Sequence, residues 1–348
     1  MNGTDKERLE QAPEKEEKII KISKKSPEER LYESLKKYEL PDYLLYTGAG
    51  GAKNWLKLDG SGTFPVARQL KKMLEENVAS IVRFIPACMS LVSVGVGDGE
   101  KERILLEELI KKNRAEKPAS EKISIRYYPA DINSQLVDIA LKKVKDLPVE
   151  KKGIVGFIED MPLLKKHWHL PVLFCILGNT FCNYEPEFIL QLVHENLEQG
   201  DLFFFDANLL SAQGSGEEAQ SARKSILGTY TSRENALFNM YPLLQYGMAP
   251  KDFDFELLLA HVDSRIGALY RTRKSLNILK DSEVKIGEET IGFKEGDIIR
   301  MGFTYKYTYD QILAFLDICG FEVLKAFLSE DRTNTMILAK KAFQNGNN

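Results

Sequence analysis

Short apolar runs alternate with amphipathic stretches along most of the chain after Ser90. The apolar runs predict strands, because they are short and rich in β-branched and aromatic residues: 91–95, 123–128, 154–158, 172–177 and 202–206. Their apolar residues do not alternate with polar ones, which is typical of strands covered on both faces of a sheet. Helices are predicted between most of them, at 100–112, 134–144 and 186–197, where apolar residues follow helical spacing. This order predicts an α/β fold with a parallel sheet and right-handed crossovers.

The C-terminal part of the chain predicts a different ending for that sheet. A helix is expected at 309–319, followed by strands at 321–327 and 335–342 that are joined by the polar turn SEDRTN. A hairpin that closes a parallel series is expected to place an antiparallel strand inside an otherwise parallel sheet.

The region from 212 to 300 does not continue the series. It contains helical stretches at 220–229 and 235–246 and the strand-like segments ALYRTRKSLNIL and SEVKIGEETIGFKEG, which predict an inserted lobe. The expected division is a flexible charged tail at 1–28, a substrate-binding lobe from 29–80 and 212–300, and a ligand-binding α/β domain from 81–211 and 301–343. The tail is expected to be flexible because it has few large apolar groups.

Composition narrows the classes of partner. With 43% hydrophobic residues, 28% charged residues and a formal net charge of −3, the chain is typical of a soluble globular protein, and its lysines are matched by acids. Neither nucleic acid nor membrane is therefore an expected partner. The N-terminal stretch has no apolar core that would predict a secretory signal. Four dispersed cysteines (Cys88, Cys175, Cys182 and Cys319) are expected to be reduced, in a cytoplasmic protein, and no metal site is expected.

A glycine turn, VGVGDGEK, follows the first predicted sheet strand. Gly95, Gly97 and Gly99 allow a sharp bend and a close approach to a ligand, and the next helix offers free N–H groups. Asp98 and Glu100 at the helix start disfavour a pyrophosphate but suit a ligand with a cationic amino-acid end, such as S-adenosylmethionine. A nicotinamide-dependent oxidoreductase and a non-catalytic nucleotide-binding module remain alternatives.

Acidic residues follow the next two strands. Asp131, at the end of IRYYPAD, is expected to accept both ribose hydroxyls of an adenosine, or else to cap the next helix. Asp160 in GFIEDMPLL is expected to accept the adenine amino group with Met161 beside the ring, and a solvated turn is the alternative. These residues share the edge at which open α/β sheets bind ligands.

Two further stretches point to the same edge. Asn179, Thr180 and Asn183 in LGNTFCNY follow the fourth strand, where Asn183 either caps a helix or holds an amine or carboxylate. The glycine-rich YTGAGGAKNW is expected to wrap the active site, with Tyr46 or Trp55 lining it.

These stretches together carry a resemblance to a known family. The segments LLYTGAGGAKNW, TFPVARQL, VGVGDGEK, YPADINSQL, LGNTFCNY and IRMGFTYKYT, within about 40–342, resemble the S-adenosylmethionine-dependent family of the histidine-specific Nα-methyltransferase of ergothioneine biosynthesis. The chain is also similar to the fungal branch that N-methylates dimethylallyltryptophan. The resemblance implies a Rossmann-like class I methyltransferase sheet with a terminal antiparallel hairpin.

The resemblance also implies roles for single residues. The turn of Gly95, Gly97, Asp98 and Gly99 would hold the methionine end of S-adenosylmethionine, Asp131 its ribose, and Asp160 with Met161 its adenine. Asn183 would hold the amine of a small amino-acid-type substrate, and Tyr230 its carboxylate.

Three positions depart from the histidine enzymes of that family. Gly302 stands where they carry a glutamate that pairs with imidazole, Phe64 where they carry a tyrosine, and Thr304 where they carry a serine. Loss of a charge and a hydroxyl removes partners that a buried imidazole needs, and glycine is expected to leave room. The resemblance implies N-methylation of the α-amino group of an amino acid or amino-acid derivative. The departures predict that this acceptor has an aromatic or apolar side chain, such as that of tryptophan; histidine is the alternative.

Overall fold

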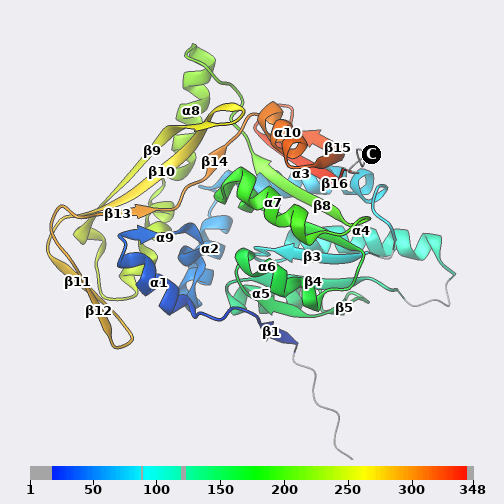
Figure 1. The fold of residues 1–348 in the computed structure, drawn as a ribbon, viewed down its shortest axis with the longest axis horizontal. Helices are drawn as coiled ribbons and strands as arrows, with labels where there is room; N and C mark the ends of the chain where they lie inside the picture. The colour runs from blue at the N-terminus through cyan, green and yellow to red at the C-terminus, as the bar shows by residue number, and fades with distance from the viewer. Residues whose placement is uncertain (1–17, 88, 119–122, 343–348) are drawn as a thin grey trace, which may run out of the picture.

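The computed structural model describes residues 18–87, 89–118 and 123–342, and a nine-stranded mixed sheet forms its centre (Figure 1). Its main path runs β1 (Ile19–Lys21), β6 (Gly153–Val155), β4 (Arg126–Asp131), β3 (Ser90–Val94), β7 (Val172–Ile176), β8 (Leu202–Asn208), β16 (Asn334–Lys341) and β15 (Phe321–Leu328). The short β5 (Glu150–Lys151) also pairs with β4. Pairs from β1 to β8 are parallel, whereas β16 is antiparallel to both neighbours. The hairpin thus places an antiparallel strand inside the sheet, as predicted.

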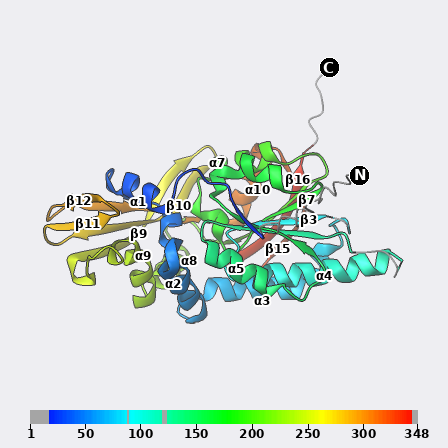
Figure 2. The same ribbon diagram turned by 90° about the horizontal axis from the view of Figure 1, so that it is seen from below.

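Helices cover both faces of this sheet, which explains the continuous apolar runs in its strands. On one face, α3 (Pro65–Val82) packs against α4 (Glu100–Glu116), with α5 (Ser134–Lys143) beside them; α7 (Pro186–Asn196) and α10 (Tyr309–Ile318) lie on the other (Figure 2). Neighbouring residues of β3 therefore enter different cores, Leu91 joining α3 and α4, and Val92 joining α7 and α10. The predicted helices after Ser90 are confirmed to within a few residues.

The inserted region and the N-terminal segment build a second sheet together. It contains β9 (Phe253–Ser264), β10 (Gly267–Ile278), β13 (Ile298–Met301), β14 (Tyr305–Lys306) and β2 (Glu39–Leu40). Because β2 pairs with β13, residues far apart in sequence share one sheet. Around it lie α1 (Pro27–Leu35), α2 (Gly48–Gly60), α8 (Glu217–Tyr230), α9 (Arg233–Leu244) and the hairpin of β11 (Ser282–Ile286) and β12 (Glu289–Phe293). The predicted domain boundaries are not tested by this arrangement, and α3 packs on the main sheet.

The described part of the expected flexible tail, residues 18–28, contains regular secondary structure. Ile19–Lys21 form β1, an edge strand paired with β6, and the side chains of Ile20 and Ile22 pack against the core around α7. Ser26 then caps α1 by accepting a hydrogen bond from the Glu29 backbone N–H. Composition averaged over the segment hid this local apolar cluster. Residues 1–17 lie outside the described part of the chain.

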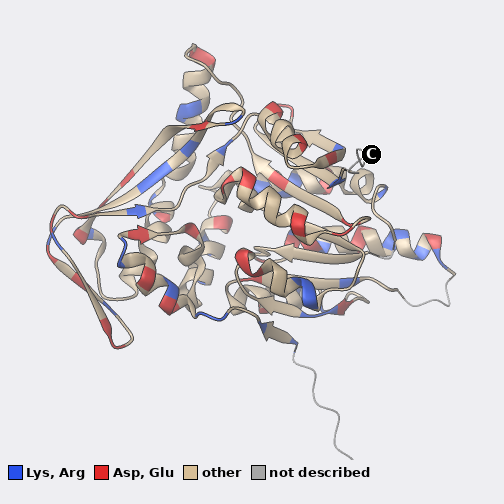
Figure 3. Cartoon of the chain, viewed as in Figure 1, with Lys and Arg blue, Asp and Glu red and all other residues tan. Residues whose placement is uncertain are grey.

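The placement of the charged residues and of the cysteines bears on the predictions made from composition. Lysine and arginine residues are interleaved with acidic residues along the elements of both sheets (Figure 3). Cys175 and Cys182 are buried thiols and Cys319 is partly buried, whereas Cys88 lies outside the described residues. Within the described ranges, no helix has the length and apolarity needed to cross a membrane, and no cluster of three metal-binding side chains occurs.

Candidate active site

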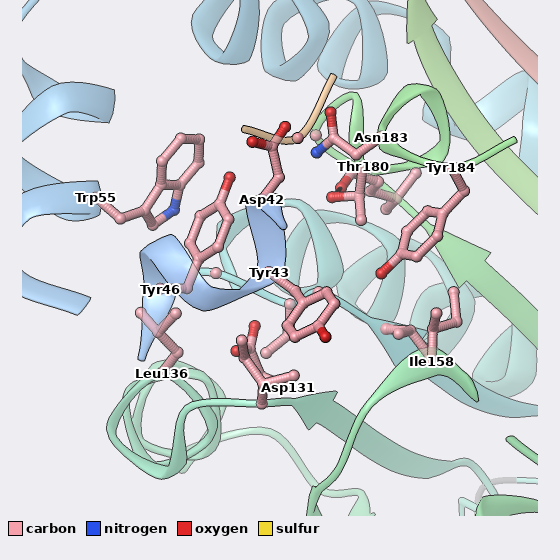
Figure 4. A pocket seen from close by; sticks show the side chains of 18 of the residues that line it. Asp42, Tyr43, Tyr46, Trp55, Asp131, Leu136, Ile158, Thr180, Asn183 and Tyr184 are labelled. Carbon is pink, nitrogen blue, oxygen red and sulfur yellow. Dashed lines mark hydrogen bonds between the residues drawn. The ribbon is translucent and has the colours of Figure 1, made fainter. Parts of the chain in front are cut away.

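A cavity of about 300 Å³ opens at the carboxyl ends of β3, β4, β6 and β7. Its opposite wall is the 3-10 helix η1 (Asp42–Tyr46) with the adjoining α2. Figure 4 shows Asp131 near the lower edge and Asn183 with Thr180 at the upper right, with Tyr43 and Tyr46 projecting between them. The residues expected to bind the cofactor and those expected to bind the acceptor amine, which come from separate motifs, therefore line one continuous cavity.

The glycine turn after β3 lines this cavity with two of its three glycines. Gly95 and Gly97 both have positive φ angles (69° and 57°), and a Cβ on Gly95 would lie 3.1 Å from Thr180 Cγ2. Gly99 serves packing instead, because a Cβ there would lie 2.8 Å from Ala140 Cα in α5, and it does not line the cavity. Asp98 lines the cavity, and its Oδ1 accepts a hydrogen bond from the Glu100 backbone N–H.

Asp131 lies at the end of β4 with 6% of its surface exposed. Its Oδ1 accepts a hydrogen bond from the Asn133 backbone N–H at 2.9 Å, while burial raises the pKa of the carboxyl group to about 6. The cap of α5 is the Asn133 side chain, which accepts from the Gln135 backbone N–H. The capping alternative for Asp131 is therefore wrong, and its carboxyl group lines the cavity.

Asp160 and Met161 are not brought to the cavity. The Asp160 carboxylate accepts a hydrogen bond from the Phe157 backbone N–H and lies 4.0 Å from Arg30, and Met161 is buried in the core beside α7. The reason is that β6 ends at Val155 and the chain then turns into the 3-10 helix η2 (Ile158–Asp160). This turn presents Ile158 and Glu159 to the cavity instead.

Asn183 ends the 3-10 helix η4 (Thr180–Asn183) and lines the cavity. Its Oδ1 accepts a hydrogen bond from the buried Thr304 hydroxyl at 2.9 Å. It does not cap α7, whose N-cap residue is Glu185. Asn179, by contrast, lies outside the cavity wall, where its Oδ1 accepts from the Asn208 backbone N–H. Thr304 therefore positions Asn183 without reaching the cavity itself.

The aromatic residues form two layers. Tyr46 and Trp55 line the cavity with ring centroids 5.4 Å apart, and Phe64 lies behind Trp55 at 6.3 Å. Tyr230 packs on Phe64 at 5.6 Å and is buried, and its hydroxyl has no hydrogen-bond partner among the described residues. The structure thus places Phe64 and Tyr230 one layer behind the cavity wall rather than on it.

Gly302 does line the cavity, but the room expected beside it is occupied. A Cβ on Gly302 would lie 2.5 Å from the Asp42 backbone nitrogen and 2.6 Å from Asp42 Cγ. Asp42 Oδ1 in turn accepts a hydrogen bond from Lys274 Nζ at 2.5 Å. The absence of a side chain at Gly302 therefore accommodates a carboxyl group from another segment, and the expectation of free space is wrong.

The motif argument missed two charged residues that lie beside the glycine turn. Asp59 and Lys101 line the cavity near Asp98. Burial disfavours the charge of Lys101, yet nearby carboxylates including Glu102 and Asp98 outweigh it and hold the pKa of Lys101 above its ordinary value. Burial raises the pKa of Asp59. Lys101 comes directly after the turn, and Asp59 is four residues after Trp55 on α2, so it shares a helix face with Trp55. Their spacing in the sequence could therefore have identified both residues as candidates for the cavity wall.

Comparison with known proteins decides the family. A profile of histidine-specific, S-adenosylmethionine-dependent methyltransferases matches residues 27–341. The chain belongs to this family. It is therefore an S-adenosylmethionine-dependent methyltransferase, as the sequence resemblance implied. Its mixed sheet contains the internal antiparallel strand that the resemblance also implied. The oxidoreductase and non-catalytic alternatives are set aside. A search of curated protein sequences gave no match.

Solved structures similar to this chain include several other methyltransferases. An S-adenosylmethionine-dependent methyltransferase from Clostridium acetobutylicum ATCC 824 has 12% identity and a TM-score of 0.39, with 80% of this chain and 92% of that chain covered. Magnesium protoporphyrin IX methyltransferase from Synechocystis PCC 6803 has 10% identity and a TM-score of 0.43, with 85% and 97% covered. The glycopeptide N-methyltransferase MtfA has 10% identity and a TM-score of 0.36, with 76% and 86% covered.

Proposed function

We propose that this methyltransferase acts on the α-amino group of an amino acid or amino-acid derivative with an aromatic side chain, such as tryptophan. The observation that carries the proposal is the single cavity that joins Asp131 and the glycine turn to Asn183, with Tyr46 and Trp55 on its wall. An apolar cavity with a few convergent polar groups is the usual form of a small-molecule site. The aromatic wall suits a flat ring.

One end of the cavity is the proposed site of S-adenosylmethionine. Asp131 is the proposed acceptor for the ribose hydroxyls, and the open backbone of Gly95 and Gly97 lets the methionine part approach. We assign the methionine carboxylate to Lys101, which has the opposite charge. For the same reason we assign the methionine ammonium group to Asp98 and Asp59. When bound, this cofactor supplies an electrophilic methyl group on a sulfonium.

The other end of the cavity is the proposed site of the acceptor amine. The nucleophile must be an unprotonated nitrogen held in line with the methyl group, so orientation and exclusion of water are what the protein contributes; well-oriented reactions gain on the order of 7–11 kcal/mol. Asn183, anchored through Thr304, is the side chain proposed to orient this amine. The role proposed for Tyr230 is to hold the acceptor carboxylate, which requires its unpartnered hydroxyl to be uncovered by a shift of Phe64 or Trp55.

Histidine is the second candidate acceptor. The family profile describes histidine-specific enzymes, and the aromatic wall suits imidazole as well as indole. An amino-acid panel with S-adenosylmethionine, followed by mass spectrometry for gains of one to three methyl groups, tests both. Methylated tryptophan or a prenylated tryptophan at the highest rate supports the first proposal, whereas faster methylation of histidine replaces it with the second. Absence of methylation on every aromatic amino acid overturns both.

A further inference from the structure

The Asp42 carboxyl group has a position that none of the roles above uses. It begins η1, lines the cavity and projects into its upper part in Figure 4, where the Asn183 amide also projects, with Tyr46 and Trp55 to one side. Its side chain is only 10% exposed. A carboxylate in so enclosed a place needs hydrogen-bond partners, because burying a charge without them is costly.

Lys274 donates a hydrogen bond to only one of the two oxygens of that carboxylate. Its Nζ donates to Asp42 Oδ1 at 2.5 Å, and its own side chain is 6% exposed. The described residues supply Asp42 Oδ2 with no hydrogen-bond donor. Asp42 therefore has one oxygen fixed by the protein and one oxygen available to a ligand in the cavity.

Gly302 is the residue that permits this placement. Any side chain there would collide with Asp42, since even a Cβ would lie 2.6 Å from Asp42 Oδ1. The Gly302 backbone N–H donates to the Leu40 carbonyl and extends the pairing of β13 with β2, two residues before η1 begins. Gly302 is thus the residue that allows the Asp42 carboxyl group to occupy its position at the cavity.

We infer that Asp42 Oδ2 accepts a hydrogen bond from a ring N–H of the methyl acceptor, so that the enzyme selects an N–H heteroaromatic amino acid, indole or imidazole, over carbocyclic rings. The inference rests on the proposed function. The Asp42–Lys274 pair has no net charge, so a neutral N–H donor matches it better than a substrate ammonium or guanidinium group. Site polar groups that lose their substrate partner discriminate strongly against the analogue that lacks it.

Isosteric substrates test this selection without a change in shape. Benzothienylalanine replaces the indole N–H of tryptophan with sulfur, and thiazolylalanine removes the imidazole N–H of histidine. We expect kcat/KM for the N–H substrate to exceed that of its isostere by about 10- to 100-fold, the range for a hydrogen bond to a charged group. Calorimetric binding of the same amino acids in the presence of S-adenosylhomocysteine should show the same ratio.

Two variants and a matched control locate the effect. Asp42→Asn weakens the acceptor, and Gly302→Ala displaces it; each should lower the ratio about fivefold or more, the difference between charged and neutral hydrogen bonds. Glu185→Gln alters another cavity carboxylate that has a basic partner, Arg271 at 3.0 Å, and should keep the wild-type ratio. Thermal unfolding of each variant confirms that it is folded.

The outcomes separate this inference from the proposed function. Equal kcat/KM for each isostere and its N–H parent overturns the role of Asp42 and leaves the methylation of an aromatic amino acid intact. The same holds if Asp42→Asn and Glu185→Gln change the ratio equally. If no amino acid in the panel is bound or methylated, the proposed function and this inference are both wrong.

Discussion

At the scale of single residues, the ribose assignment gives a direct prediction. Asp131→Ala should weaken S-adenosylmethionine binding by ~1.5–3 kcal/mol, because a hydrogen bond to a charged group is lost. Asp160→Ala is the matched control, since its carboxylate faces Arg30 and the Phe157 backbone outside the cavity, and cofactor affinity should change less than about twofold. Calorimetry measures both. Equal losses in the two variants would contradict the placement of the ribose at Asp131.

The pKa of Asp131 adds a pH dependence. Burial raises this pKa to about 6, so the carboxyl group is protonated below that pH and can no longer accept hydrogen bonds from both ribose hydroxyls. Cofactor affinity should therefore fall as the pH is lowered through 6, by up to about tenfold between pH 6 and pH 5, and then level off once the contribution of the carboxylate is lost. Asp131→Asn should abolish this dependence between pH 5 and 7. A dependence that persists in the variant would assign it to another group.

Asn183 is expected to affect kcat rather than cofactor affinity. Asn183→Ala removes the side chain proposed to orient the amine, so kcat should fall about 10²-fold or more while cofactor affinity stays nearly unchanged. Thr304→Val, which removes only the hydroxyl that anchors Asn183, should show a smaller loss of the same kind. Loss of cofactor affinity in proportion to kcat would contradict this role.

Sequence reasoning located those candidate residues whose position follows from the nearest strand end, while their roles stay predictions. Asp131, Asn183, Gly95 and Gly97 all reach the cavity because parallel strands bring their carboxyl ends to one edge. It failed where the local turn decides, as with Asp160, or where the partner is distant in sequence. Nothing in the local sequence around Gly302 shows that Asp42 fills the space beside it.

At the scale of elements, the helices and strands of the main sheet were predictable from apolar spacing, and their order gave the topology. β9 was missed because its sequence, FDFELLLAHVDS, mixes alternating and continuous apolar positions, and its pairing with β10 rather than its own pattern defines it. β1 was missed because three residues carry little periodicity, and only the exposed edge of β6 makes them a strand.

The contact between the glycine turn and α5 yields an element-scale prediction. Gly99→Ala should lower the free energy of unfolding by about 2–4 kcal/mol, because it combines a positive φ of 75° with a Cβ 2.8 Å from Ala140 Cα. Gly97→Ala meets only Trp55 Nε1 at 3.5 Å, so it should cost about 1–2 kcal/mol and act chiefly on cofactor affinity. Denaturant unfolding compares the two. A larger stability loss at Gly97 would contradict the packing role given to Gly99.

At the scale of the whole molecule, the cavity depends on two chain segments that meet only after folding. η1 supplies Asp42, Tyr43 and Tyr46 to the cavity wall from the N-terminal segment. Lys274 of β10, in the inserted region, does not line the cavity but donates a hydrogen bond to Asp42. β2 and β13 join the same two segments by backbone pairing. The position of Asp42 in the proposed substrate end therefore depends on a partner from the second sheet, which explains why no single motif in the sequence predicted it.

The buried Asp42–Lys274 pair provides the test of that dependence. Lys274→Met should lower the free energy of unfolding by about 3–5 kcal/mol, since it leaves Asp42 charged and enclosed without its partner. Adding Asp42→Asn to that variant removes the orphaned charge and should recover part of the loss. Lys294→Met is the control in the adjoining hairpin: its pair with Asp281 is 79% and 62% exposed, so the cost should be about 0–1 kcal/mol. Denaturant unfolding of the four proteins decides the matter. If Lys274→Met is no more destabilising than Lys294→Met, the pair does not hold the two segments together, and the cavity must be maintained by the β2–β13 pairing and the aromatic layers alone.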